Sequence, residues 1–118
     1  MDHMQEATRN LIAAIEACPE YRRYENAKQK MYKYPILKKK TDEFRKQNYE
    51  LQNSDADIFE EADRLWQKYY HIIQYPVVWE YLAAETAFCK MMQKMNLQIL
   101  ENLDFETGFE EFQETFDI

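Results

Sequence analysis

Side chains with the chemistry for catalysis or metal binding are few in this chain. The histidines His3 and His71 form neither a His-Glu-x-x-His nor a Glu-x-x-His pair, because the residue three before His71 is Lys68. A Ser-His-Asp triad would have to recruit Ser54, the one serine, which suits a helix cap better. A single glycine, Gly108, cannot make a glycine-rich phosphate loop. We therefore expect no catalytic residue, no metal site, no cofactor and no small-molecule substrate.

Three further side chains have structural explanations. Cys18 and Cys89 are not in a Cys-x-x-Cys spacing, and no cluster of basic residues near Cys89 would stabilise a thiolate, so we expect both to be reduced and to fill core space. Glu85 is the one acid in the apolar stripe of the longest predicted helix, where an unpaired carboxylate is costly. We expect it to pair with a tyrosine, lysine or arginine across a helix hairpin or a dimer seam. The alternative is a catalytic acid.

That longest helix spans residues 76–103 and has an apolar residue at every third or fourth position. Pro76 suits its first turn, because the missing N–H has no helical partner there. A helix of 28 residues is about 42 Å long, whereas a compact sphere of this chain would be about 35 Å across. We therefore expect its end to pack on another chain, as a homodimer or a higher oligomer. The predicted interface residues are Val78, Leu82, Glu85, Met92, Met95 and Ile99.

The methionine-rich run 89–95 within this helix has two interpretations. It either packs in the core or forms an adaptable surface that accepts more than one partner helix, since the methionine side chain is flexible.

The remaining helices are separated by prolines and by one polar turn. The residue before a proline is disfavoured in the α conformation, so Cys18-Pro19 and Tyr34-Pro35 should break the chain, and Ser54 should cap the helix after the turn. The predicted ranges are 4–17, 19–32, 35–52 and 54–74. Because Tyr75-Pro76 leaves a minimal loop, we expect the last two helices to form an antiparallel hairpin.

Composition supports a single all-α domain over residues 1–103: a five-helix bundle with a long antiparallel C-terminal helix hairpin. Apolar residues make up 46% of the 118 residues, enough for a core, and one glycine and three prolines are too few for the turns of a β-sandwich. No run of 18 apolar residues predicts membrane insertion, and residues 1–10 do not resemble a signal peptide. We expect a cytoplasmic protein.

Charge is distributed unevenly around the net value of −7. Residues 22–46 hold ten basic and three acidic residues, a local balance of +7 that leaves −14 for the rest. This segment is either a solvated pair of helices or a docking surface for an acidic partner, with Lys38, Lys39 and Lys40 as the contacts. A third alternative is RNA contact through its interleaved tyrosines, although a pI of about 4.9 opposes it.

Residues 104–118 form a short aromatic-acidic tail. Its four phenylalanines, at spacings of four, three and four, are Phe105, Phe109, Phe112 and Phe116, and no basic residue follows Glu101. We expect a recognition element that binds a partner through these phenylalanines, in cis or in trans. The alternative is that the tail completes the subunit core.

Several short motifs, in order and spacing, resemble the YlbF/YmcA family of small helical bacterial regulators. They are Glu20-Tyr21-Arg22-Arg23-Tyr24 with Ala27-Lys28, Pro35-Ile36-Leu37, Phe44-Arg45 with Leu51-Gln52, and Pro76-Val77-Val78 followed by Tyr81-Leu82 and Ala84-Glu85. The resemblance covers roughly residues 5–103. It implies an all-helical, homo-oligomeric, non-enzymatic regulator that binds other regulatory proteins, like family members that act in competence, sporulation, biofilm formation and mRNA processing.

Two departures from the family pattern limit what the resemblance implies. Tyr75 stands before the central proline where the family has a short polar residue. Some relatives bind iron–sulfur clusters through cysteines, several of them in a C-terminal tail. This tail has no cysteine, so the resemblance does not imply an iron–sulfur cluster in this chain.

Overall fold

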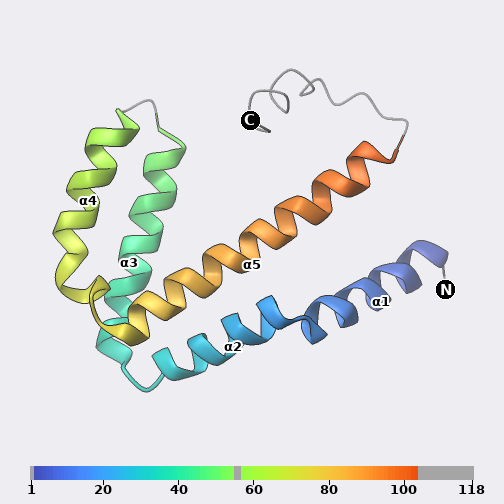
Figure 1. Cartoon of the computed structure of the whole chain (residues 1–118), viewed down its shortest axis with the longest axis horizontal. Helices are drawn as coiled ribbons and strands as arrows, with labels where there is room; N and C mark the ends of the chain where they lie inside the picture. The colour runs from blue at the N-terminus through green and yellow to red at the C-terminus, as the bar shows by residue number, and fades with distance from the viewer. Residues whose placement is uncertain (1, 55–56, 104–118) are drawn as a thin grey trace. The chain divides into compact units, whose positions relative to one another are not determined.

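The computed structural model describes residues 2–54 and 57–103. These residues form five helices and no strand, which confirms the all-α prediction (Figure 1). The helices are α1 His3–Ala17, α2 Pro19–Met31, α3 Pro35–Gln52, α4 Ile58–Ile73 and α5 Pro76–Glu101. The chain divides within α5 into two compact units, residues 1–88 and 89–118. The predicted tail, with its four phenylalanines, lies outside the described residues, and the predicted boundary after residue 103 stays a prediction.

The helix starts follow the expected side-chain chemistry, with one correction. The Asp2 carboxylate caps α1 by accepting a hydrogen bond from the Met4 amide at 2.6 Å. Asp57, and not Ser54, caps α4, with its carboxylate 3.4 Å from the Glu60 amide. The predicted cap was wrong because α4 begins at Ile58, and a carboxylate next to that start also suits the helix dipole. The Ser54 hydroxyl instead donates to the last turn of α3.

The core of residues 1–88 consists of two clusters. The first joins α2 to the start of α5, and its buried members are Ala27, Met31, Val78, Tyr81 and Ala84. The second joins α3 to α4, and its buried members are Phe44, Leu65, Tyr69, Ile72 and Ile73. Leu37 and Leu82 pack against both clusters. The two clusters together hold the first turns of α5 against α2, α3 and α4.

The consecutive helices α3 and α4 lie side by side and pack against each other (Figure 1). The Gln47 side-chain amide donates to the Tyr69 hydroxyl at 2.7 Å, and the rings of Phe44 and Tyr69 are 5.6 Å apart. The predicted hairpin of α4 and α5 stays unconfirmed. What the structure shows there is a short turn, in which the Tyr75 amide donates to the Ile72 carbonyl.

Helix α1 has no buried residue, although its sequence has an apolar face. Met4, Leu11 and Ile12 are 74%, 39% and 50% exposed. None of the described helices is both long and apolar enough to cross a membrane. Among the described residues of the first unit, the apolar face of α1 is therefore largely exposed.

Candidate interaction surfaces and the polar network between α3 and α5

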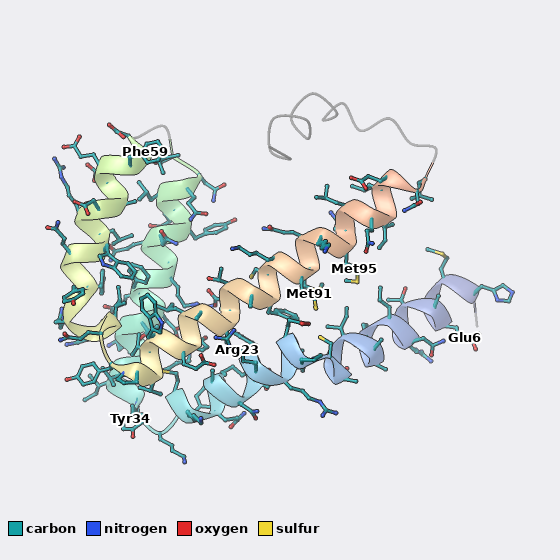
Figure 2. All side chains as sticks on the ribbon, viewed as in Figure 1. Glu6, Arg23, Tyr34, Phe59, Met91 and Met95 are labelled. Atoms are coloured by element: carbon teal, nitrogen blue, oxygen red, sulfur yellow. The ribbon has the colours of Figure 1, made fainter. Side chains whose placement is uncertain are left out.

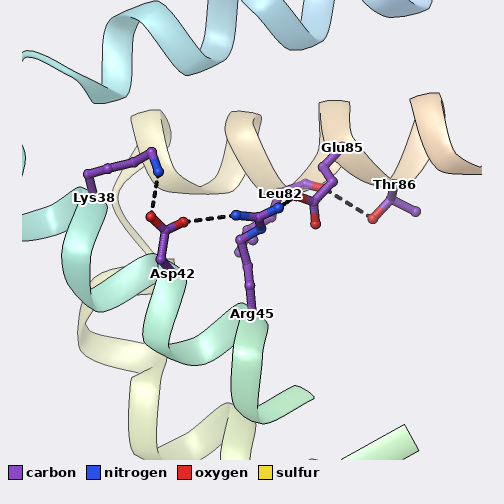
Figure 3. A network of polar contacts seen from close by, with 6 residues as sticks. All are labelled: Lys38, Asp42, Arg45, Leu82, Glu85 and Thr86. Atoms are coloured by element: carbon purple, nitrogen blue, oxygen red, sulfur yellow. Dashed lines mark hydrogen bonds and ion pairs between the residues drawn. The ribbon is translucent and has the colours of Figure 1, made fainter. Parts of the chain in front are cut away.

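A chain of four charged side chains connects α3 to the first half of α5 (Figure 3). On α3, the Lys38 ammonium pairs with one oxygen of Asp42, and the Arg45 guanidinium donates to the other oxygen at 2.9 Å. Arg45 also forms an ion pair with Glu85 of α5. Spacings of three and four residues place the α3 members on one face of the helix. The pairing expected for Glu85 is therefore present, and its partner is Arg45.

The two cations of this network also face a buried aromatic ring. Tyr81 is 1% exposed, and its ring centroid lies 5.4 Å from the Arg45 guanidinium carbon and 5.7 Å from the Lys38 nitrogen. Cations at these distances are attracted to the face of the ring. Burial raises the pKa of the Tyr81 hydroxyl, although Arg45 acts in the opposite direction. The hydroxyl therefore stays protonated at neutral pH.

Electrostatics favour the charged forms of Asp42 and Arg45. Burial by itself would raise the pKa of Asp42, but hydrogen bonds from Lys38 and Arg45 outweigh it and lower that pKa. Burial also disfavours the charged form of Arg45, but the hydrogen bonds to Glu85 and Asp42 outweigh it and raise its pKa. Neither shift moves a pKa toward neutral pH, and a pKa near the working pH is what suits a general acid or base. The arrangement is suited to holding α3 against α5.

A second bridge connects α2 to α5. The Arg23 guanidinium donates to both oxygens of Glu80, at 2.9 and 2.8 Å, and this hydrogen bonding lowers the pKa of Glu80. The pair is exposed, so its contribution to stability is small. Beside it, the rings of Tyr21 and Tyr24 lie 5.6 and 5.8 Å from that of Phe88. These two tyrosines are half-buried, and their rings pack against Phe88. Nothing in the described residues favours the RNA alternative.

The predicted interface residues fall into two groups. Val78 is fully buried in the core of the single chain, Leu82 is half-buried against both core clusters, and Glu85 is paired with Arg45, so these three offer little surface to a second chain. The others, Met92, Met95 and Ile99, lie in the second unit, where Ile99 is 47% exposed. Helical periodicity places all six on one stripe but does not show which part of the stripe is covered within the chain.

The three predicted docking lysines also differ from one another. Lys38 is tied to Asp42, whereas Lys39 and Lys40 are exposed and form no ion pair with any residue that the structure describes. Lys39 lines an open hollow of about 560 Å³, and Lys40 does not. Sequence reasoning missed Lys46 at the same hollow, although its spacing of seven residues from Lys39 places both lysines on one face of α3.

An exposed aromatic pair on α4 and α5 was also missed. Trp66 and Trp79 are 38% and 55% exposed, and their rings meet edge to face with centroids 6.0 Å apart. Phe59, at the start of α4, is 89% exposed (Figure 2). Tryptophan is enriched in protein interfaces, but these two are thirteen positions apart in the sequence, so no local spacing connects them.

The predicted role of Cys89 as a core residue was wrong. Cys89 is exposed because the buried positions of α5 end at Ala84, and Cys18 is half-buried between α1 and α2. Within residues 2–54 and 57–103, no three histidine, cysteine, aspartate or glutamate side chains are grouped as metal ligands.

These features define a small all-α protein in which the ion pairs Arg23–Glu80 and Arg45–Glu85 connect α5 to other helices. Comparison with known proteins gives the family: residues 4–104 match the one described as "Control of competence regulator ComK, YlbF/YmcA", and the chain belongs to it. A UPF0342 protein of Caldicellulosiruptor bescii is 25% identical over 114 residues, which are 90% of this chain and 92% of the relative. No solved structure matches the chain. The resemblance inferred from the short motifs is confirmed.

Proposed function

We propose that this protein is a non-enzymatic regulatory adaptor of the cytoplasm that acts by binding itself and other regulatory proteins. The family description, control of a competence regulator, supports a regulatory role. The observation that carries the proposal is the exposed apolar surface of α1, where the described residues bury no side chain fully and leave Leu11 and Ile12 exposed. Apolar surface of this kind on a small protein marks a site of protein association.

The proposed contact between copies uses Met92, Met95 and Ile99 of α5. These residues recur at spacings of three and four on one side of the helix (Met95 is labelled in Figure 2). Two copies would then meet through the same surface, as in a two-fold dimer.

Light scattering on the purified chain tests self-association, and we expect a mass that is a multiple of 14.5 kDa. Met95→Glu should lower that mass, because a charge in a packed apolar seam is left unpaired. Lys94→Glu, at the adjacent exposed position, is the matched control and should leave the mass unchanged. A mass of 14.5 kDa for the unmodified chain at micromolar concentration contradicts the proposal.

Binding to other regulatory proteins is tested by capture from a bacterial lysate with the full chain as bait. We expect regulators of competence among the captured proteins, and we expect Leu11→Asp to lose them while Ala13→Asp, exposed on the opposite face of α1, retains them. Equal capture by both variants would show that the apolar face of α1 is not the binding surface.

A further inference from the structure

The hollow beside Lys39 combines an aromatic wall with unneutralised cations. It lies at the junction of α2 and α3, and its lining residues are Tyr32, Pro35, Lys38, Lys39, Asp42, Glu43 and Lys46. Its volume of about 560 Å³ is within the range of about 300–1,000 Å³ that holds ligands in proteins. We call it the α3 hollow.

Charge pairing leaves two of its three lysines available. Lys38 is held by Asp42, whereas Lys39 and Lys46 are exposed and have no ion-pair partner in the described part of the chain. Glu43 is the one lining acid outside the internal network. Tyr32 is 54% exposed, which is a large aromatic surface to leave in water. The α3 hollow therefore suits a segment that brings both carboxylates and an apolar ring.

The chain itself contains such a segment outside the described residues. Residues 104–118 include four phenylalanines and six acidic residues and no basic residue. We propose that the α3 hollow of one copy binds residues 104–118 of a second copy. The proposal rests on the proposed self-association and adds a contact separate from the one through Met95.

A reciprocal exchange of this kind would be closed by symmetry. Every copy has one α3 hollow and one acidic segment, so in a two-fold pair each chain donates its segment to the other, and neither an α3 hollow nor an acidic segment is left unoccupied. The aromatic rings of the segment would meet Tyr32, and the carboxylates would meet Lys39 and Lys46.

The test uses the full chain with the photoreactive residue p-benzoylphenylalanine at Tyr32. Heavy-isotope and light-isotope chains are unfolded together, refolded as a mixture and irradiated, and crosslinked peptides are identified by mass spectrometry. We expect crosslinks from position 32 to residues 104–118 that join a heavy to a light chain. The same probe at Phe59, which is exposed on α4, should not give them.

Charge variants separate a specific site from general attraction. Lys39→Glu and Lys46→Glu should each lower the yield of mixed crosslinks several-fold, and Glu43→Gln should raise it. Lys40→Glu makes the same charge change one position from Lys39 and outside the α3 hollow, so the yield should be retained. An equal loss with Lys40→Glu overturns the site.

The remaining outcomes are equally decisive. Three outcomes would overturn the α3 hollow as the binding site without affecting self-association. They are crosslinks that join only chains of one isotope, crosslinks to other segments, and no crosslinks in a chain that light scattering shows to be oligomeric. A monomeric mass overturns self-association itself, so the two failures are distinguishable.

Discussion

The ion pair of Arg45 with Glu85 should be a main support of the contact between α3 and α5. The test compares Arg45→Met, Glu85→Gln and the double variant with the unmodified chain. Arg45 also donates to Asp42 at 2.9 Å, so its removal leaves Glu85 without its partner and leaves Asp42 with Lys38 alone. Glu85→Gln removes only one interaction, because the guanidinium keeps Asp42.

The size of the effect follows from how deeply the pair is buried. Removing one member of a fully buried pair costs about 3–5 kcal/mol, but the side chains of Arg45 and Glu85 are 33% and 25% exposed. Solvent screening reduces the expected loss to about 2–3 kcal/mol for Arg45→Met and about 1–2 kcal/mol for Glu85→Gln. The double variant should lose less than the sum, with a coupling free energy of about 1–2 kcal/mol.

Urea unfolding followed by circular dichroism measures these free energies, and each kcal/mol should lower the melting temperature by about 3–6 °C. Arg64→Met is the matched control, since Arg64 pairs only with Glu60 and Glu61 of its own helix and is two-thirds exposed. It should change stability by less than about 0.5 kcal/mol. A coupling free energy near zero between Arg45 and Glu85 would refute the conclusion that this pair joins α3 to α5.

Three further predictions concern the same bundle. Thr41→Val should raise the free energy of unfolding by about 1 kcal/mol, because Thr41 is 0% exposed and its hydroxyl has no hydrogen-bond partner among the described residues. Thr41→Ser keeps the hydroxyl and should not raise the free energy of unfolding. Equal stability of the two variants would argue against this explanation. The lowered pKa of Asp42 means that its stabilising effect is present above the unfolded pKa of about 3.9 and is lost as pH falls through the lower folded value. Acid titration of unfolding should therefore be less steep in Asp42→Asn, and an unchanged profile would contradict the assigned hydrogen bonds. Deleting residues 104–118 should leave circular dichroism helical if the tail is a separable element, whereas an unfolded truncated chain would show that the tail belongs to the core.

The sequence by itself was sufficient to predict the helices and most of the residues at which they begin and end. Prolines at 19, 35 and 76 and the three-to-four spacing of apolar residues act locally, so they predict helices whatever the tertiary contacts are. The expected cap at Ser54 failed for a local reason as well, because Asp57 lies closer to the first turn of α4. The family resemblance also rested on local motifs, and the match over residues 4–104 confirms it.

The use of each helical face depended on tertiary structure. Val78 and Ile99 lie on one predicted stripe, yet Val78 is fully buried within the chain and Ile99 is 47% exposed. Lys38 and Lys39 are neighbours in sequence, yet only Lys38 is neutralised, by Asp42. Periodicity determines the direction in which a side chain points from its helix. Whether that side chain is buried or paired depends on the residues that pack against it. For Val78 these residues are distant in the chain, and for Lys38 the partner is one helical turn away.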